Sequence, residues 1–275
     1  MGLPVRVAVL RGLIKELQTS ARDERPLVVG GATELARVLA RELARGGDPA
    51  AVRDGDPAGA AVYVHVLAGG EEDAVALKRA RRARAPIVAV ASGPLADDVS
   101  IPFVLATDVV RVAPGEGFPL ERIAEVVAGR LGEDAAPLAA RLPVLRRAVC
   151  RRLVASFSAK NGLVAAAVFI PGADLPVLAL NQVRMLLRIE QAHGLAADPR
   201  ERAPEVLASL AAGIGLRAAA RELLDLVPVA GWAVKGAVAY AGTRALGEAA
   251  IRRLESPSSP ASFRPRPAAA SRAAP

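Results

Sequence analysis

The hydrophobic pattern of residues 24–132 alternates between short apolar runs and longer amphipathic stretches. The runs "LVVGG", "AAVYVHVLAG", "APIVAVASG" and "VVRVAPG" are short, rich in valine and closed by glycine, which predicts strands. Between them, "ATELARVLARELARGG" spaces Leu35, Val38, Leu39 and Leu43 as one face of a helix. Strands that alternate with helices predict a parallel sheet with helices packed on it.

From Pro137 onward the pattern contains no strand signal and predicts four helices. The first runs to about residue 170, as one helix or as two joined near Pro143, and it ends before Pro171 because proline disfavours helix in the preceding residue. The others begin at "ADLPVLALNQ", "PEVLASLAAG" and "VAGWAVKGAV". Such an order suggests paired helical hairpins. The predicted fold class is an α/β lobe followed by an all-α helical-hairpin bundle.

The expected organisation has four parts: an N-terminal helix within residues 1–23, an α/β lobe at 24–132, a helical domain at 137–255 and a tail at 256–275. A chain of 275 residues is long enough for two domains that each bury a core. The tail "SPSSPASFRPRPAAASRAAP" is rich in Pro, Ser and Ala, lacks acidic residues and carries three arginines. This composition predicts a disordered basic tail.

Composition narrows the location and the partners. Hydrophobic residues make up 52% of the chain but aromatic residues only 3%, so the core must be built from Ala, Val and Leu. The net charge of +8 favours an anionic partner, either a membrane surface or nucleic acid. Few aromatic platforms for base stacking disfavour nucleic acid. The single Cys150 excludes an intramolecular disulfide, and charges interrupt the N-terminal apolar run, so a cytoplasmic protein is expected.

A glycine turn between a predicted strand and helix, at Gly30 and Gly31, is where phosphates bind to a helix N-terminus in nucleotide-binding proteins. A P-loop places Gly, Lys and Ser or Thr after it, and counting from Gly30 these places fall on Leu35, Ala36 and Arg37. The G-x-G-x-x-G dinucleotide pattern lacks its second and third glycines as well. Gly30 and Gly31 stay candidate cofactor contacts, but no cofactor, metal or enzymatic activity is expected.

Two further motifs bear on the same question. "DPAG", at residues 56–59, matches the D-x-x-G pattern of a GTPase magnesium loop, although Pro with Gly also makes an ordinary turn. Where a GTPase reads guanine with N-K-x-D after the fourth strand, this chain has "ASGP". His65 and His193 have no neighbouring Cys or His and are interpreted as structural. The α/β lobe is therefore expected to be a degenerate P-loop or Rossmann-like domain.

The segment "FIPGADLP", at residues 169–176, interrupts an otherwise apolar stretch. Residues 161–183 contain Asp174 as their only charge and are long enough to cross a bilayer, but Pro171, Gly172, Asp174 and Pro176 break them in the middle. A re-entrant or interfacial hairpin, or a buried hairpin in a soluble bundle, fits better than one crossing. Asp174 is expected to cap the next helix, with an ion-binding carboxylate at a broken membrane helix as the alternative.

Small residues and basic residues form two more patterns. Ala233, Ala237, Ala241, Ala245 and Ala249 recur every four positions, as residues do where two helix backbones approach closely. Such a stripe occurs in membrane helices and in tight soluble bundles alike. The basic cluster before the apolar hairpin is also expected on the surface, where it suits a solvated helix face or an anionic membrane leaflet. Its members are Arg146, Arg147, Arg151, Arg152 and Lys160.

Residues 158–255 carry a longer motif set. It consists of a P-G-A-D-x-P break at residues 171–176, then Gln182, Met185 and Arg188, then a P-x-x-G-W segment with Pro228, Gly231 and Trp232, and an A-x-x-T-R-A-L-G pattern within residues 239–247 that departs at Tyr240. In these features the chain resembles the bacterial YcjF-like domain of unknown function. Such domains often follow Era-like GTPase domains and are commonly described as membrane-associated.

The resemblance implies that the α/β lobe is a degenerate version of the GTPase domain that often precedes such domains. The likeness of the lobe itself lies only in its position and its strand–helix order. The leading hypothesis is a non-enzymatic scaffold or regulatory protein on the cytoplasmic face of the inner membrane. Its partners would be the membrane or its anionic surface, a protein, or a second copy of the chain. A nucleotide-binding switch that uses Gly30 and Gly31 is the first alternative, and a soluble basic nucleic-acid-binding protein is the second.

Overall fold

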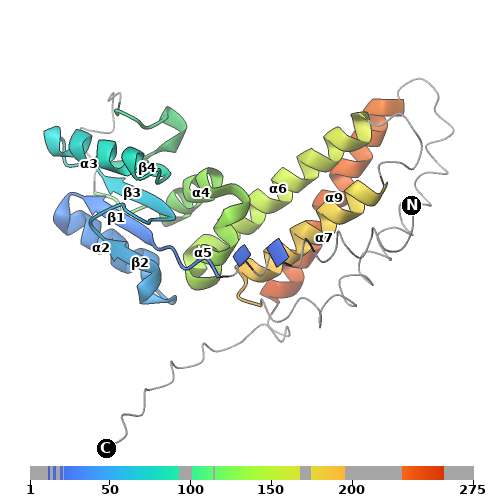
Figure 1. The fold of residues 1–275 in the computed structure, drawn as a ribbon, viewed down its shortest axis with the longest axis horizontal. Helices are drawn as coiled ribbons and strands as arrows, with labels where there is room; N and C mark the ends of the chain where they lie inside the picture. The colour runs from blue at the N-terminus through green and yellow to red at the C-terminus, as the bar shows by residue number, and fades with distance from the viewer. Residues whose placement is uncertain are drawn as a thin grey trace, which may run out of the picture.

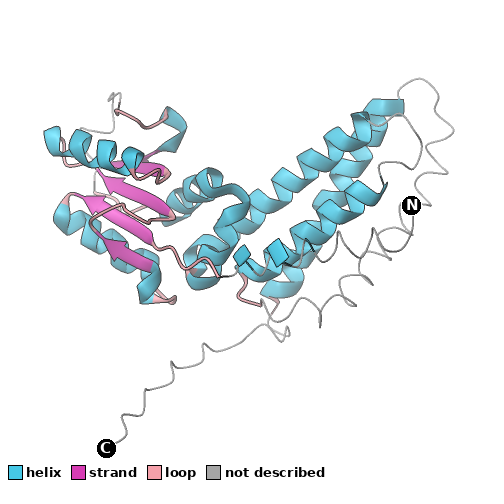
Figure 2. Cartoon of the chain, in the orientation of Figure 1, coloured by secondary structure: helices cyan, strands magenta, loops and turns pink. Residues whose placement is uncertain are grey.

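A computed structural model describes residues 12, 15, 16, 19, 20, 22–92, 101–113, 115–167, 175–195 and 231–256, with backbone only at 175, 231 and 232. The strands gather at one end of the molecule and the long helices at the other (Figures 1 and 2). The predicted α/β lobe with a parallel sheet, followed by a helical region, is confirmed. Pro171, Gly172, Asp174, Pro228, the predicted third helix and residues 257–275 lie outside the described residues.

The sheet contains five parallel strands in the order β2-β1-β3-β4-β5. They are β1 (Leu27–Gly31), β2 (Val52–Asp54), β3 (Val62–Val66), β4 (Ile87–Ser92) and β5 (Val109–Val112). This is a doubly wound order, and its topological switch point lies between β1 and β3. The edge strand β2 was not predicted, because its three residues "VRD" form no apolar run.

Helices cover both faces of the sheet. Helices α2 (Thr33–Ala44) and α4 (Leu120–Leu131) share a buried cluster with Leu27, Val29 and Val64 of the strands. Helix α3 (Glu71–Arg82) covers the opposite face, where it packs with Val28 and Tyr63. Successive side chains of a strand point to opposite faces, so the continuous valine runs supply both cores. Figure 1 shows α2 and α3 on opposite sides of the sheet.

The buried face of α2 differs from the predicted one. Leu39 and Leu43 are buried as expected, but Leu35 and Val38 remain 43% and 39% exposed. Ala36 and Ala40 complete the face against the sheet instead. Two small side chains at this contact let the helix backbone approach the strands, and the larger residues are rotated towards solvent.

The helical region follows a short 3-10 turn, η4 (Gly132–Ala135). Its helices are α5 (Ala136–Arg141), α6 (Pro143–Ala167), α7 (Leu175–Ala192) and α9 (Gly231–Glu255). The chain turns at Leu142, which is extended, so α5 and α6 are two helices joined next to Pro143, as one of the two predicted arrangements had it. Within the described ranges, none of the helices combines the length and apolar character needed to cross a bilayer.

A continuous core joins the lobe to the helical region. Buried residues extend from the sheet through α4 and α5 to α6 and α7, including Ala135, Ala136 and Leu138 at the predicted boundary. Arg141 strengthens this connection, because its Nε lies 3.0 Å from Asp48 Oδ2 and its Nη1 donates to the Glu24 carbonyl at 2.8 Å. The lobe therefore provides a packed base from which α6 extends.

Candidate functional site

The predicted glycine turn lies at the switch point, where β1 and β3 end side by side. Gly31 adopts a φ of +101°, and a Cβ there would overlap the carbonyl oxygen of Val66. A Cβ on Gly30 would overlap the hydroxyl of Tyr63. The N–H of Ala32 donates to the Val66 carbonyl at 2.9 Å. Both glycines therefore allow β1 to approach β3, and a hydrogen bond to β3 already occupies the first amide of the turn.

The charges around this turn oppose a phosphate ligand. Glu34 lies in the first turn of α2, and the first turn of α3 carries Glu71, Glu72 and Asp73. The positive end of a helix dipole attracts anions, but carboxylates placed there satisfy it and repel phosphate. Gly30 and Gly31 consequently serve strand packing in this geometry.

The "DPAG" segment is a braced turn between β2 and β3. Asp56 Oδ1 accepts a hydrogen bond from the Ala58 N–H at 3.1 Å. Arg53 Nη2 donates to the carbonyls of Asp56 and Ala58, at 2.8 and 2.7 Å. Gly59 has a φ of +70°, which favours glycine. These contacts use the Asp and Gly of the motif to make the turn itself, which is the simpler of the two interpretations of the motif.

A buried polar chain lies beneath the same edge. Tyr63 Oη is 3.0 Å from His65 Nδ1, and His65 Nε2 is 2.8 Å from Asp73 Oδ1. Burial lowers the pKa of His65 despite Asp73. Burial alone would raise the pKa of Asp73, but hydrogen bonds from Gly69, His65 and Ala68 outweigh it and lower that pKa. An ionised Asp73 accepts from Nε2–H, which leaves Nδ1 to accept from the Tyr63 hydroxyl.

This chain has a structural role, because Tyr63 and His65 are 2% and 1% exposed. It ties β3 to the first turn of α3. His65 was interpreted as structural from the sequence, whereas its partners Tyr63 and Asp73 were missed. One signal could have found Asp73: an acidic residue in the first turn of a helix lies close to the end of the strand before it.

The basic cluster of α6 divides into residues with different environments. Arg146 is partly buried, and its Nε donates to the Ala192 carbonyl at the end of α7, at 3.1 Å. Burial lowers the pKa of Arg146. Burial, with the charge of Arg146, also lowers the pKa of His193 to about 4. Arg146 thus satisfies a terminal carbonyl of α7 rather than standing free on the surface.

Two other cations of the cluster pair with acidic residues that precede α6 in the chain, one in α4 and one in η4. Arg147 Nη1 lies 3.1 Å from Glu121 Oε1, and Lys160 pairs with Glu133. Lys160 also lies over the Phe157 ring, with Nζ 5.0 Å from its centroid. Arg151 and Arg152 are exposed and, within the described part of the chain, have no acidic partner.

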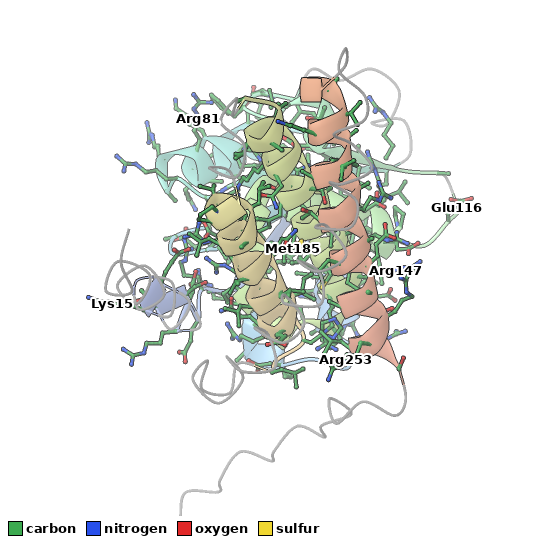
Figure 3. All side chains as sticks on the ribbon, turned by 90° about the vertical axis from the view of Figure 1, so that its right-hand side faces the viewer. Lys15, Arg81, Glu116, Arg147, Met185 and Arg253 are labelled. Carbon is green, nitrogen blue, oxygen red and sulfur yellow. The ribbon has the colours of Figure 1, made fainter. Side chains whose placement is uncertain are left out.

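A groove lies between α6 and α9, beside these arginines, with a volume of about 580 Å³. Its apolar lining consists of Val154, Ala155 and Ile251, and its charged lining of Arg147, Arg151, Arg244, Glu248, Arg252 and Glu255. Arg244 pairs with Glu248 at 2.8 Å. Figure 3 shows Arg147 beside α9 and Arg253 near the lower end of that helix. The groove is a concave feature with arginines on both of its walls.

Large apolar side chains are exposed at the far end of the helical region, on helices that precede and follow residues 168–174. Leu163 near the end of α6 is 71% exposed, and Val177 in the first turn of α7 is 46% exposed. Tyr240 of α9 is 37% exposed, and it packs against Gly162. Figure 1 shows this end of α6, α7 and α9 pointing away from the sheet.

The helix-break residues that the structure describes stand at helix starts. Pro176 is the second residue of α7 and is exposed, a position where proline is tolerated. Gly231 and Trp232 are the first two residues of α9. Helix α7 begins at Leu175, directly after Asp174, so the capping role of Asp174 stays a prediction for a residue outside the described ones.

The alanine stripe of α9 does not make the contact with α6. All five of its members are exposed: Ala233, Ala237, Ala241, Ala245 and Ala249. Gly236 and Gly247 face α6 instead, where a Cβ on Gly247 would lie 2.5 Å from Val154 Cγ2 and one on Gly236 3.0 Å from the Gly162 carbonyl oxygen. These contacts make α6 and α9 antiparallel neighbours. Glycine has no side-chain carbon, so two helix backbones approach more closely at a glycine than at an alanine. This explains why the contact lies at the glycines.

Buried polar residues connect the three long helices. Asn161 Nδ2 of α6 and Gln182 Nε2 of α7 both donate to Thr243 Oγ1 of α9, at 2.9 and 3.0 Å. Asn181 Nδ2 donates to Asn161 Oδ1 at 2.8 Å. Met185 reaches Gly247 in the same core. Residues from two distant stretches of the sequence motif set therefore meet inside the bundle.

Arg188, the remaining residue of that set on α7, docks the N-terminal segment. Its guanidinium lies 3.3 Å from Glu16 Oε1 and bonds to Ser20. Arg184 contacts the other oxygen of Glu16 at 2.6 Å. Residues 12, 15, 16, 19 and 20 are helical. A buried guanidinium thus links α7 to a helix far away in the sequence.

No protein-family model, curated protein or solved structure matches the chain. Function is therefore inferred from the residues and their geometry.

Proposed function

We propose that this protein is a non-enzymatic scaffold or regulatory protein that associates with an anionic membrane through its helical region. The exposed apolar end of that region carries the proposal. Leu163, at 71%, is the most exposed large apolar side chain among the described residues, and Val177, at 46%, lies in the first turn of the next described helix. Exposed apolar side chains that gather at one site mark a contact surface.

Two weak signals together give useful membrane affinity. Burying one Leu or Val side chain contributes about 1.5–3 kcal/mol, and each cation near an anionic leaflet contributes about 1 kcal/mol. A single apolar anchor binds only marginally, whereas an anchor combined with a basic patch binds stably. The helical region carries both, because the exposed Leu163 and Arg151 lie on α6 and the exposed Arg252 lies on the neighbouring α9.

In this proposal the α/β lobe is a pseudo-GTPase-like module that holds the helical region and presents a surface to a protein partner. The packing roles of Gly30 and Gly31 and the carboxylates at the two helix starts support the non-enzymatic part. The continuous core between lobe and helices supports their action as one body.

Flotation with vesicles tests the proposal. The full chain is mixed with neutral or anionic vesicles at low and at high salt, and the fraction that floats is measured. We expect flotation on anionic vesicles that high salt reduces but does not abolish, because apolar contact is not screened. No flotation on any vesicle would overturn the proposal.

A matched pair of variants locates the contact. Leu163→Gln with Val177→Gln removes exposed apolar residues near the end of α6 and the start of α7, and we expect it to abolish the salt-resistant fraction. Leu35→Gln with Val38→Gln makes the same chemical change on α2 of the lobe, at residues 43% and 39% exposed, and should leave flotation unchanged. Equal losses in both would contradict a contact through the helical region.

The second candidate function is a nucleotide-binding switch. One observation favours it: Gly30 and Gly31 lie at the topological switch point, where open α/β sheets bind ligands. Titration with labelled GTP, ATP and NAD tests it. The carboxylates of Glu34, Glu71 and Glu72 lead us to expect no binding at millimolar nucleotide.

A further inference from the structure

We propose that the groove between α6 and α9 binds the phosphate group of an anionic phospholipid headgroup, with Arg151 and Arg252 as its direct ligands. The inference rests on the proposed membrane association and adds a specific site to it.

The groove has the size and the walls of a ligand site. Its volume of about 580 Å³ lies within the range of small-molecule sites. The antiparallel packing of α6 and α9 brings residues near the start of α6 opposite residues near the end of α9. Arginines therefore line the groove from both walls: Arg147 and Arg151 from α6, and Arg244 and Arg252 from α9.

Ion pairing leaves two of these arginines available. Arg147 pairs with Glu121, and Arg244 pairs with Glu248. Within the described part of the chain, Arg151 and Arg252 make no side-chain ion pair, although Glu255 lines the same groove. Two guanidinium groups on facing walls can each present a planar fork of N–H donors to phosphate oxygens, a geometry that Lys does not offer.

The apolar lining favours a lipid over a free phosphate compound. Val154 is buried, and with Ala155 and Ile251 it supplies an apolar surface beside the arginines. A soluble phosphate gains nothing from such a surface, whereas the glycerol and first methylenes of a phospholipid do. An extended acidic peptide fits less well, because Glu248 and Glu255 on the α9 wall would repel its additional charges.

The experiment compares two double variants of equal charge. Arg151→Gln with Arg252→Gln removes the two proposed ligands. Arg152→Gln with Arg253→Gln removes one charge from each of the same helices, at exposed neighbours that do not line the groove. Both lower the net charge by two, so general attraction to an anionic surface changes to a similar extent. Circular dichroism checks that both variants fold.

Partition onto vesicles of phosphatidylcholine with phosphatidylglycerol or phosphatidic acid is the readout. At physiological salt we expect the groove variant to lose at least about tenfold more affinity than its control, a difference that general charge does not explain. Equal losses would overturn the groove and leave the membrane proposal standing. Absence of wild-type binding would overturn both.

A second arm separates the lipid from a soluble ligand. Glycerol 3-phosphate is titrated calorimetrically into the full chain without vesicles, and we expect no heat of binding at millimolar concentration. Binding that the groove variant abolishes would identify a soluble phosphate ester as the ligand and overturn the lipid assignment.

Discussion

The carboxyl edge of the sheet and the outer surface of α6 and α9 differ in how far their side chains have partners within the molecule. At the carboxyl edge of β1 and β3, the backbone at Gly30 and Gly31 packs closely against β3. The side chains of His65 and Asp73 contact each other within the lobe. On α6 and α9, Arg151, Arg252 and Leu163 are turned outwards. The difference teaches that the glycines of a turn typical of ligand sites also let two strands pack closely, whereas α6 and α9 expose arginines and an apolar side chain.

The substitution with the largest expected effect on the free energy of unfolding lies at the packed edge of the lobe. Gly31→Ala places a Cβ against the Val66 carbonyl at a φ of +101°. Strain and overlap together should cost about 4 kcal/mol in the free energy of unfolding, measured in urea. Gly55→Ala is the control, because Gly55 has a φ of +98° in open space and should cost only about 1–2 kcal/mol. Equal costs would show that β1 does not approach β3 as described.

The next largest cost is expected from a substitution that disrupts the contact between α6 and α9. Gly247→Val should cost about 3 kcal/mol, since its Cβ would lie 2.5 Å from Val154 Cγ2. Ala245→Val makes a comparable change on the exposed side of α9 and should cost about 0.5 kcal/mol, through helix propensity alone. Urea unfolding of both variants measures the difference. A larger cost at Ala245 would mean that the alanine stripe makes the contact.

The next prediction concerns the loss of stability in acid, to which one histidine in each region contributes. Burial lowers the pKa of His193 to about 4, so its neutral form stabilises the folded chain above the unfolded pKa of 6.5. This stability is lost as pH falls from 6.5 towards 4, by about 2 kcal/mol after allowance for solvent screening at a partly buried site. The free energy of unfolding is measured in urea at several pH values. Between pH 7 and 4.5 it should fall less steeply in His193→Gln than in the wild type. The part that His65 contributes, in the lobe and in the same direction, should remain. An unchanged slope would place His193 in solvent.

The smallest expected change in the free energy of unfolding is that of the two arginines proposed as ligands in the groove. Arg151→Gln with Arg252→Gln should change the free energy of unfolding by less than about 0.5 kcal/mol, because both are exposed and neither pairs with an acidic residue in the described ranges. The same urea measurement applies. A loss above about 2 kcal/mol would show that these arginines hold α6 and α9 together instead of serving a ligand.

The sequence was sufficient for the alternation of strands and helices in the lobe and for the helical region after it, since each predicted strand carries valines and no strand signal follows Pro137. It was insufficient for β2, whose three residues follow no pattern, and for the face of α2, where alanines replace larger residues at the sheet. The roles within the basic cluster were also out of reach. Glu121, Glu133 and Ala192, which engage Arg147, Lys160 and Arg146, are far from them in the chain.

A fluorophore placed on the chain measures membrane contact most directly. Cys150 is fully buried, and burial raises its thiol pKa to about 12, so it should not compete for a thiol-reactive label. Leu163→Cys and Leu35→Cys are labelled separately with an environment-sensitive dye and mixed with anionic vesicles. We predict that emission at position 163 shifts to the blue and is shielded from an aqueous quencher, whereas emission at position 35 is unchanged. No shift at position 163, or equal shifts at both, would contradict membrane association through the helical region.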